Sequence, residues 1–439
     1  MKACSGANGN TLSRSFLYVI LLSLAFASAG VANIVNVSVN CQTGGSLNAA
    51  IAALNPADQN TVTLTGGCTE NVVVSGFTYL VIQGPAVLNQ PASGLALNIQ
   101  NSSQILIQNV TFTGVAGGTN TSPLVSVSNS QSVGFTNCLF MESGGMGLQV
   151  ISSGVGLNGG MVMQNAWQGI VVSGASSLGL NGWDVNSPVT VLDNGMAGAN
   201  YDGIDVFQGG MLNMGPYVQV IGNSGNGITL AGASVSACCG SAVGTPNSTN
   251  TNPMSPGPVI AANKGWGIYA GNYSTVTLVG NNSGTPAVII SNNTQGGMVV
   301  DTSWAGLFYG VNVANNGFST QTNPTGGIYV TENGALDIQG GTIEDNTGPG
   351  ILASQGSAVT LCCGETITGN SESGMYIDVN ASAYFPNGGG AANSIKGNTP
   401  TDLTCDAGGL AAADKGYDPG IGKKSCPNYF NVPPRKKAK

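Results

Sequence analysis

Short runs of alternating apolar and polar residues fill the chain after residue 55, and turn-forming residues interrupt them every few positions. Val276–Val279 (VTLV) and Val359–Leu361 (VTL) are typical runs. An alternation with a period of two predicts β-strands that bury one face and expose the other. The Gly, Asn and Ser residues between the runs favour tight turns. The pattern therefore predicts an all-β chain of many short strands.

One segment near the start shows a helical period instead. Leu47, Ile51 and Leu54 share one face of a helix. Ser46 stands at the N-cap position and Pro56 lies just past the end, and both are typical boundary signals. We therefore predict a short amphipathic helix over residues 46–54.

A repeat organises the rest of the chain. An asparagine follows a strand-like run at intervals of 23 to 40 residues, most of them 28 to 30: Asn109, Asn137, Asn165, Asn194, Asn223, Asn263, Asn293, Asn316, Asn346, Asn370 and Asn398. A glycine and an apolar residue follow most of these asparagines, as in Gly203-Ile204 and Gly267-Ile268. A period of this length indicates a stacked-repeat architecture.

Each repeat holds about three short strands, which cannot bury their apolar side chains alone. Stacked repeats pair every strand with those above and below, about 4.8 Å apart, and enclose the apolar side chains. Asn tolerates the left-handed conformation of turns, and its amide can hydrogen-bond to the next Asn in a column. The sequence thus predicts a single parallel β-helix of about 11–12 coils over residues 61–400. The apolar residue after each glycine is expected to point inward.

This repeat resembles the right-handed parallel β-helix proteins of the pectate-lyase-like superfamily, in their secreted bacterial type. The resemblance covers residues 34–400. It implies that the short helix plugs the open first coil, so residues 30–60 are expected to form an N-terminal cap. Residues 401–439 are expected to cover the other end as a disulfide-closed cap with a basic tail. The repeat is specific for the fold and weak for function.

The first 29 residues have the features of a secretory signal. Lys2 and Arg14 supply positive charge, Phe16–Phe26 is apolar, and Ala27–Ala29 offers small residues for cleavage. The alternative is an N-terminal membrane anchor, but the apolar run is shorter than the roughly 20 residues that a span requires. No later segment is long and apolar enough to span a bilayer. We therefore expect a secreted or cell-surface protein.

Charged residues make up only 7% of the 439 residues, and the formal net charge is −8. Without residues 1–29, nine basic residues face 19 acidic ones, so the net charge is −10. Four of those nine lie in the tail Pro433–Lys439. A body this acidic argues against nucleic acid and anionic membrane surfaces as partners. It also makes a neutral polysaccharide an easier partner than an acidic one.

The chain contains no histidine, and its only arginines are Arg14 and Arg435. This excludes Ser-His-Asp triads, Cys-His dyads and His-ligated metal sites. Polygalacturonase-like members of the superfamily carry an Asp-Asp pair, a Gly-His-Gly and an Arg-x-Lys element, whereas this chain has no histidine, no Asp-Asp dipeptide and no arginine in its body. Pectate lyases use Arg or Lys as a base beside Ca²⁺-binding aspartates. Lys264, next to Trp266, is the one conceivable lyase base, and no cofactor is expected.

Nine cysteines remain after residue 29, and export permits disulfides. Cys41 and Cys68 flank the first structured segment, and Cys405 and Cys426 flank a terminal loop. Each of these pairs is expected to form a disulfide at one end of the fold. The other five are two adjacent pairs, expected as vicinal disulfides or buried thiols, and one odd residue that packs as a small apolar side chain: Cys238-Cys239, Cys362-Cys363 and Cys138.

Aligning the repeats on the Gly-apolar pair places other residues on the outer surface of one strand column. Exposed aromatic rings beside carboxylates suit carbohydrate, because sugar rings stack on aromatic faces and their hydroxyls donate to carboxylates. The alternative is that aromatic residues simply favour strand surfaces. The expected substrate-binding residues are Tyr269, Tyr329, Tyr376, Phe207, Asp301 and Trp304.

Asp202 and Asp205 (YDGIDV) form the best candidate catalytic pair, because Asp202 precedes the turn glycine and Asp205 points outward from the strand. Catalysis by two carboxylates needs an acid and a base or nucleophile about 5–10 Å apart. Two aspartates at a turn equally suit a Ca²⁺ ion or turn-capping hydrogen bonds. The other acidic candidates are Asp184, Asp193, Glu344 and Asp345.

These residues predict a secreted β-helix that binds a neutral extracellular polysaccharide and, if enzymatic, processes it as a carboxylate-dependent hydrolase or lyase. The alternative is a non-catalytic structural or adhesive rod. Two loops, Gly244–Pro258 and Asn316–Gly326, interrupt the period. They are expected either to wall a binding groove or to be neutral decoration.

Overall fold

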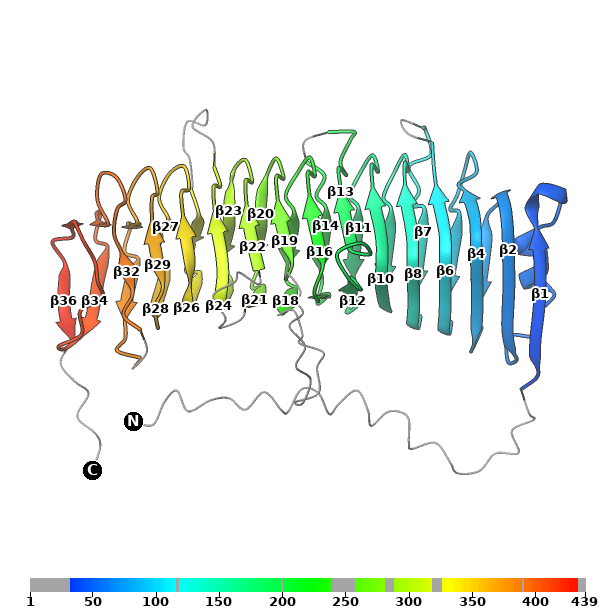
Figure 1. The fold of residues 1–439 in the computed structure, drawn as a ribbon, viewed down its shortest axis with the longest axis horizontal. Coiled ribbons are helices and arrows are strands. Elements are labelled where there is room, and N and C mark those ends of the chain that lie inside the picture. The colour runs from blue at the N-terminus through cyan, green and yellow to red at the C-terminus, as the bar shows by residue number, and fades with distance from the viewer. Residues whose placement is uncertain are drawn as a thin grey trace, which may run out of the picture.

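The computed structural model describes residues 32–115, 118–198, 200–238, 257–280, 288–317, 326–388 and 391–432. They form a long rod in which the chain advances one coil at a time from one end to the other (Figure 1). The coils build a 14-stranded sheet, here called sheet B, and a 22-stranded sheet, sheet A, and all strand pairs are parallel. The right-handed parallel β-helix predicted from the repeat is thereby confirmed.

Sheet B takes one strand from each coil, and its strands pair in sequence order: β3 (Val72–Ser75), β5 (Leu97–Gln100), β7 (Val125–Ser128), β9 (Leu148–Ile151), β11 (Ile170–Ser173), β14 (Ile204–Phe207), β17 (Ile228–Ala231), β20 (Trp266–Gly271), β23 (Gly296–Asp301), β25 (Ile328–Thr331), β27 (Ile351–Ala353), β30 (Met375–Ile377), β33 (Leu403–Cys405) and β35 (Lys424–Ser425). This regular order is what positions one row of outward side chains along the rod.

Sheet A takes a single strand from some coils: β1 (Ile34–Asn40), β2 (Gln59–Thr69), β4 (Leu80–Asn89), β6 (Ser103–Thr113), β8 (Gln131–Met141), β10 (Gly154–Met163), β24 (Trp304–Ala314), β26 (Ala335–Glu344), β34 (Leu410–Asp414) and β36 (Tyr429–Val432). From the other coils it takes two shorter strands: β12 (Ser177–Asn181), β13 (Val189–Leu192), β15 (Met211–Met214), β16 (Val218–Ile221), β18 (Ser234–Cys238), β19 (Val259–Ala261), β21 (Thr275–Val279), β22 (Val288–Ser291), β28 (Ala358–Cys362), β29 (Thr366–Thr368), β31 (Ser382–Phe385) and β32 (Ser394–Ile395).

A corner divides the long strands of sheet A into two halves. β10 pairs with β12 through its first half and with β13 through its second half, so one long strand corresponds to two short ones. At this corner Asn109 in β6 and Asn137 in β8 adopt left-handed φ angles of 54° and 49°. Each coil therefore contains three strand segments, as the sequence pattern predicted.

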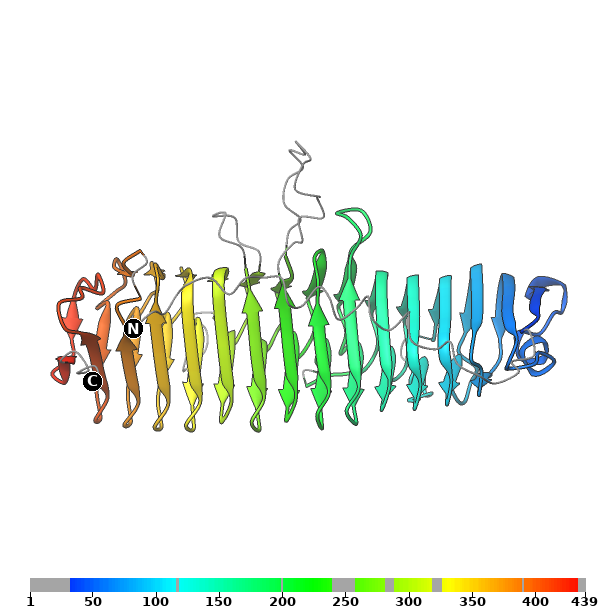
Figure 2. The same ribbon diagram turned by 90° about the horizontal axis from the view of Figure 1, so that it is seen from below.

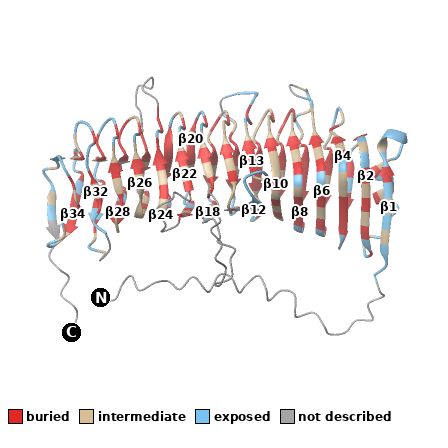
Figure 3. Ribbon diagram, in the orientation of Figure 1, coloured by how far each residue is buried: buried red, intermediate tan, exposed pale blue. Residues whose placement is uncertain are grey.

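The core is a continuous column of apolar side chains inside the coils. Figure 3 colours all buried residues red, and they recur along the strands of the rod. The apolar residue after each repeat glycine points inward as predicted, and Ile170, Ile204, Ile228 and Ile268 are fully buried. Burial of such rows by neighbouring coils supplies the main favourable free energy of folding.

A ladder of buried asparagines runs along the rod, with one asparagine at the same turn of each successive coil. In this ladder, each Nδ2 donates to Oδ1 of the asparagine one coil further on, as from Asn194 to Asn223 (3.0 Å) and from Asn223 to Asn263 (2.9 Å). The same Oδ1 atoms accept from the backbone N–H of the preceding asparagine. The members are Asn165, Asn194, Asn223, Asn263, Asn293, Asn316, Asn346, Asn370 and Asn398. Asp402 ends the ladder by accepting both bonds from Asn398.

Asn109 and Asn137 do not belong to this ladder, which corrects the prediction for these two residues. Both are exposed and lie at the corner of sheet A. Their 28-residue spacing matches that of the ladder because all coils have similar lengths, so spacing alone does not identify the corner. Ser143, not Asn137, occupies the position next to Asn165, and its backbone N–H donates to Asn165 Oδ1.

The ladder also explains the glycine that follows each asparagine. A Cβ atom on Gly203 would lie 2.6 Å from Nδ2 of Asn223 and 2.7 Å from the carbonyl oxygen of Gly227. Both distances are shorter than a non-bonded carbon atom tolerates. A residue with a side chain at this position would therefore clash with the ladder asparagine, so the ladder requires glycine here. The Asn and Gly-apolar repeats in the sequence are therefore parts of one packing arrangement.

A second column, of serines, was not recognised in the sequence. The backbone N–H groups of Ser102, Ser130 and Ser153 donate to the hydroxyl of the serine one coil further on, at 3.0–3.1 Å. Ser274 and Ser303 repeat the contact later in the rod. Serine is so frequent in this chain's turns that its period is hidden in the sequence.

The stack is longer than predicted. Sheet B has 14 strands, so the rod has more coils than the 11–12 expected. The expected number was too low because it counted coils by their asparagines, and the coils that begin with β3, β33 and β35 lack the repeat asparagine. β1 already pairs with β2, and β34 pairs with β36. Coil strands thus extend into both regions predicted to be caps, residues 30–60 and 401–439.

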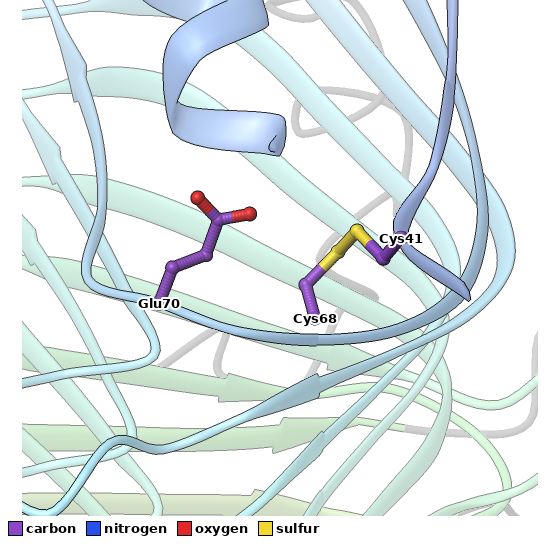
Figure 4. A group of neighbouring side chains, drawn as sticks. All are labelled: Cys41, Cys68 and Glu70. Carbon is purple, nitrogen blue, oxygen red and sulfur yellow. A yellow bond between two sulfur atoms is a disulfide. The ribbon is translucent and has the colours of Figure 1, made fainter. Parts of the chain in front are cut away.

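The N-terminal end is closed by the predicted helix, α1 (Leu47–Ala52), which follows the 3₁₀ turn η1 (Cys41–Thr43). Leu47 and Ile51 are buried, and Ser46 caps the helix through Ala49 N–H. Glu70 points at the same helix end (Figure 4), where its carboxylate accepts from Ser46 Oγ and from two backbone N–H groups. Burying this end of the stack is the role that the resemblance implied for the helix.

The disulfides predicted at the two ends are both present, Cys41–Cys68 and Cys405–Cys426. Cys362 and Cys363 form a vicinal disulfide. Cys138 is free and buried, and burial raises its pKa to about 11. Cys238 is also disulfide-bonded, whereas Cys239 lies outside the described residues.

Several predictions concern residues that the structure does not describe: the secretory signal (1–29), most of the loop Gly244–Pro258, residues 318–325 of the second loop, and the basic tail from 433 onward. Among the described residues, no helix has the length and apolar character that crossing a bilayer requires.

Candidate functional site

One row of outward side chains runs along the outer surface of sheet B. The strand pairing places Asp205 opposite Thr229, Thr229 opposite Tyr269, and Tyr269 opposite Val299. The row continues through Tyr329 and Leu352 to Tyr376, with one residue from each strand. The register predicted from the Gly-apolar pair is therefore confirmed for the three tyrosines and for Asp205.

Asp202 and Asp205 meet at one end of this row. The two carboxyl groups are close enough for Asp202 to raise the pKa of Asp205. Asp202 is 9% exposed and accepts bonds from Asn226 N–H and Thr229 Oγ1, both at 2.5 Å. Oδ2 of Asp205 accepts from Gln168 Nε2 at 2.9 Å, whereas Oδ1 is buried without a partner. The structure thus places the two predicted residues side by side, and hydrogen bonds from the two neighbouring coils fix their side chains.

The contact changes the protonation of the pair. Burial and the neighbouring Asp202 raise the pKa of Asp205 to about 8, and the hydrogen bond from Gln168 offsets only part of this effect. Two carboxylates in contact cannot both ionise easily, so one retains a proton at neutral pH. A proton shared between the two groups would give the buried Oδ1 of Asp205 the partner that it lacks.

A stacked aromatic pair stands next to the carboxyl pair and was missed in the sequence. The rings of Trp167 and Tyr201 are 5.9 Å apart and nearly parallel, with an angle of 8°. Trp167 precedes Gln168, and Tyr201 precedes Asp202. The loop from the ladder to β14 spans residues 195–203, whereas four residues, 166–169, suffice in the preceding coil. That extra length was the available signal.

Tyr269 lies over its own strand and reaches the next coil. Its hydroxyl donates to Oδ2 of Asp301 at 3.0 Å. A Cβ atom on Gly271 would lie 3.0 Å from Cε1 of Tyr269, so the ring covers this glycine. Partial burial and the contact with Asp301 raise the pKa of Tyr269. The phenol is therefore fixed across the face of sheet B.

The other two tyrosines are anchored in the same manner. Ser354 Oγ donates to the hydroxyl oxygen of Tyr329 at 3.3 Å. Tyr376 interacts with Asp406, and partial burial together with Asp378 and Asp406 raises its pKa. Since the tyrosines stand in every second coil, their rings repeat about every 10 Å along the rod.

The remaining predicted binding residues are distributed differently. Phe207 ends β14 and pairs with Ala231, in the neighbouring outward row. Asp301 is in that row too, bonded to Tyr269. Trp304 does not share this face: it begins β24 in sheet A and lies near Phe308, with ring centroids 6.5 Å apart. The turn after Asp301 carries the chain into the other sheet, which sequence adjacency did not reveal.

The other acidic candidates have structural contacts. Asp184 Oδ1 accepts from Asn186 N–H and caps a turn, and Glu344 accepts from Asn312. Asp193 and Asp345 occupy left-handed turn positions, with φ of 51° and 52°. Lys264, the candidate lyase base, is exposed and its Nζ donates to Ser224 at 3.5 Å.

The sole group of three potential metal ligands among the described residues is Cys41, Cys68 and Glu70. Figure 4 shows that the two sulfur atoms are bonded to each other. The carboxylate is engaged by the start of α1. This group is therefore a structural element of the N-terminal end rather than a cation site.

A second buried carboxyl group lies outside the candidate site. Glu365 is fully buried, neither of its oxygens has a well-placed hydrogen-bond partner, and burial raises its pKa to about 8. In the unfolded chain the same group would ionise near its ordinary value of about 4.3. The folded protein therefore holds protons, at Glu365 and at Asp205, that the unfolded chain releases above about pH 4.5.

We expect the free energy of unfolding to fall as the pH rises from about 4.5 to 8. One group with such a shift contributes a slope of about 1.4 kcal/mol per pH unit within this window. Chemical unfolding of the full chain at several pH values measures the slope. Glu365→Gln should reduce the slope by about half, because Asp205 still contributes its share, while Glu372→Gln, at an exposed glutamate, should leave the slope as it is. An unchanged slope in Glu365→Gln would contradict the role of this residue.

No protein-family model matches the chain, and no curated protein matches it. Among solved structures, the chain is similar to the A-module of a mannuronan C-5 epimerase from Azotobacter vinelandii (12% identity, 88% of this chain and 99% of that one, TM-score 0.47). It is also similar to the catalytic unit of a GH87 α-1,3-glucanase from Streptomyces thermodiastaticus (14%, 93% and 71%, TM-score 0.39) and to the tailspike receptor-binding protein of bacteriophage Det7 (12%, 92% and 77%, TM-score 0.32). Likenesses of this size do not indicate a function, and the strand pairing establishes the β-helix by itself.

Proposed function

We propose that this protein binds a neutral extracellular polysaccharide along the outward row of sheet B, and that the Asp202–Asp205 pair donates a proton for its cleavage. The observation that carries the proposal is the joined carboxyl pair in line with three anchored tyrosines. Flat rings at regular intervals provide stacking surfaces for successive sugar units. The row would thus orient the polymer along the rod.

The charges on this face favour a neutral polymer. Asp301 and Asp378 stand in or beside the outward rows, and Glu332 follows β25. Lys424, in the last strand of sheet B, is the one basic residue within the sheet's described strands. An anionic polysaccharide would be repelled along most of the face, whereas sugar hydroxyls donate to carboxylates.

The carboxyl pair suits the role of a single acid. Asp202 accepts hydrogen bonds from Asn226 N–H and Thr229 Oγ1, so both of its oxygens are engaged and the pair offers one proton, on Asp205. The raised pKa keeps a proton on Asp205 at neutral pH. As a general acid, Asp205 gives this proton to the glycosidic oxygen as its bond to the anomeric carbon breaks, a water molecule adds its hydroxyl to that carbon, and the proton released by the water restores the carboxyl pair.

An extracellular location is part of the proposal. Three disulfides are present among the described residues, two of them at opposite ends of the rod. Disulfides persist in oxidising compartments. Export of the chain agrees with the apolar segment at its N-terminus.

Replacing the three tyrosines tests the binding face. We expect Tyr269→Ala, Tyr329→Ala and Tyr376→Ala combined to weaken binding of a neutral polysaccharide by about tenfold for each ring, because each stacking contact contributes up to about 1.5 kcal/mol. A glycan array identifies the polymer, and titration gives the affinities. Tyr273→Asn is the matched control, since Tyr273 is 85% exposed and lies outside the row.

The second candidate is a structural or adhesive rod without a glycan site. It is favoured by the tyrosine hydroxyls, which already bond to Asp301 and Ser354 within the protein. If the triple variant binds every polymer as the parent does, the proposed face is wrong. If the unsubstituted protein binds no polymer on the array, a structural or adhesive rod is the better interpretation.

A further inference from the structure

A groove with a volume of about 370 Å³ lies on sheet A, at the corner between its two halves. It is formed by the corner of β6, β8 and β10 and by the loop 182–188, which joins β12 to β13. Its floor includes Thr111, Leu139 and Met161, and the amides of Asn109, Asn137 and Asn186 line it. None of these residues belongs to sheet B.

The loop 182–188 is an ordered wall. In the coils of β6, β8 and β10 the chain turns this corner without leaving the strand. The next coil inserts the loop, which Figure 2 shows as a coloured loop standing out from the edge of the rod. Trp183 N–H donates to Ser187 O at 3.0 Å, and Asn186 N–H donates to Asp184 Oδ1 at 2.8 Å. These bonds fix the shape of the loop beside the groove.

Trp183, in the same loop, does not line the groove but brings an exposed aromatic ring beside it, next to the lining residue Gly160. Its side chain is 64% exposed, although tryptophan is usually well buried. The indole lies against Gly159, where an added Cβ atom would be 3.2 Å from its Cδ1. Gly159 occupies the corner position that holds Asn109 and Asn137 in the two preceding coils. Because glycine has no side chain, this position leaves room for the indole of Trp183.

The polar groups of the groove are available to a ligand. Among the described residues, the side-chain amides of Asn109 and Asn137 have no hydrogen-bond partner, and both residues are exposed. The lining contains no Asp, Glu, Lys or Arg. Between Glu70 and Asp184 the sequence has one charged residue, Glu142. An ionic ligand would therefore find no counter-charge in the groove.

We infer that this groove is a second binding site, and that it takes a neutral oligosaccharide stacked on Trp183. Amides donate to and accept from sugar hydroxyls, an exposed indole stacks on the apolar face of a sugar ring, and the uncharged lining selects against charged ligands. The inference shares the class of ligand with the proposed function, but it stands on different residues in a different sheet.

Binding of neutral hexasaccharides of glucose and mannose to the full chain tests the inference, with tryptophan fluorescence and calorimetry as readouts. We expect Trp183→Ala to weaken binding of at least one hexasaccharide by tenfold or more. Asn109→Gly combined with Asn137→Gly removes the amides, keeps the left-handed backbone of the corner, and should also weaken it. Val185→Ala is the control, because this residue lies in the same loop and is 74% exposed but carries no aromatic ring.

The outcomes separate the two sites. Unchanged affinities in both the Trp183 and the asparagine variants would overturn the inference, whatever the tyrosine variant of sheet B does. Weakened binding in both, with unchanged binding in the tyrosine variant, would support the groove and overturn the proposed face. A loss in Trp183→Ala alone, with unchanged binding in the asparagine variant, would contradict the role given to the amides.

Discussion

Asp205→Asn is expected to lower the rate of glycan cleavage by about 100- to 10,000-fold while the affinity for the glycan stays within a factor of a few. This is the range that a positioned general acid contributes. Asparagine keeps the size of the side chain and an oxygen that accepts from Gln168, so the site should retain its shape. Turnover of the polymer identified by array, measured as new reducing ends, gives the rate.

The pH profile provides an independent check on the same residue. With the pKa of Asp205 near 8, activity should persist at neutral pH and decline above about pH 8, as the proton is lost. Asp202→Asn removes the neighbouring carboxylate that raises this pKa, so the decline should move to lower pH. Asp193→Asn, at an exposed turn, is the control. An unchanged rate in Asp205→Asn would show that another group supplies the proton.

Asn223→Ala is expected to lower the free energy of unfolding by about 3–5 kcal/mol. Asn223 lies in the middle of the ladder, where its side chain donates to Asn263 and to the carbonyl of Val191, and accepts twice from Asn194. Alanine leaves these buried groups without partners, and each such loss costs about 1–3 kcal/mol. The position has no left-handed φ, so alanine adds no backbone strain.

Urea unfolding of the full chain measures this loss, and Asn315→Ala is the matched control. Asn315 immediately precedes a ladder residue but is exposed, with a φ of 56°. Its replacement should cost about 1 kcal/mol through strain at the left-handed position. If both variants lose the same amount, the ladder contributes no more than an ordinary turn residue.

The sequence predicted those features that depend on periodicity alone. The inward residues, the outward row with Asp205 and the tyrosines, and the capping helix follow from strand alternation and from the Gly-apolar register. Asn109 and Asn137 were assigned to the wrong turn because a period fixes the distance between coils but not which corner a residue occupies. The corner is determined by whether the amide is buried against the next coil, as in Asn165.

The candidate site could be predicted less completely, because its features arise from contacts between coils. The spacing of Asp202 and Asp205 suggested a pair, but their joined carboxyl groups depend on Gln168 from one neighbouring coil and Thr229 from the other. The stacking of Trp167 on Tyr201 likewise joins two coils. Glu365 gave no sequence signal, since an isolated glutamate in a turn region is usually solvated.

In a molecule built only of nearest-neighbour layers, disassembly is easiest at a terminus, where a layer has one neighbour to leave instead of two. Cys41–Cys68 and Cys405–Cys426 sit at those two places. Opening in the middle would create two new free edges and break the asparagine column, so it is the costlier route. The two disulfides thus stabilise the terminal coils, where unfolding would begin. The coils between them are protected by their two neighbours and need no disulfide to the next coil.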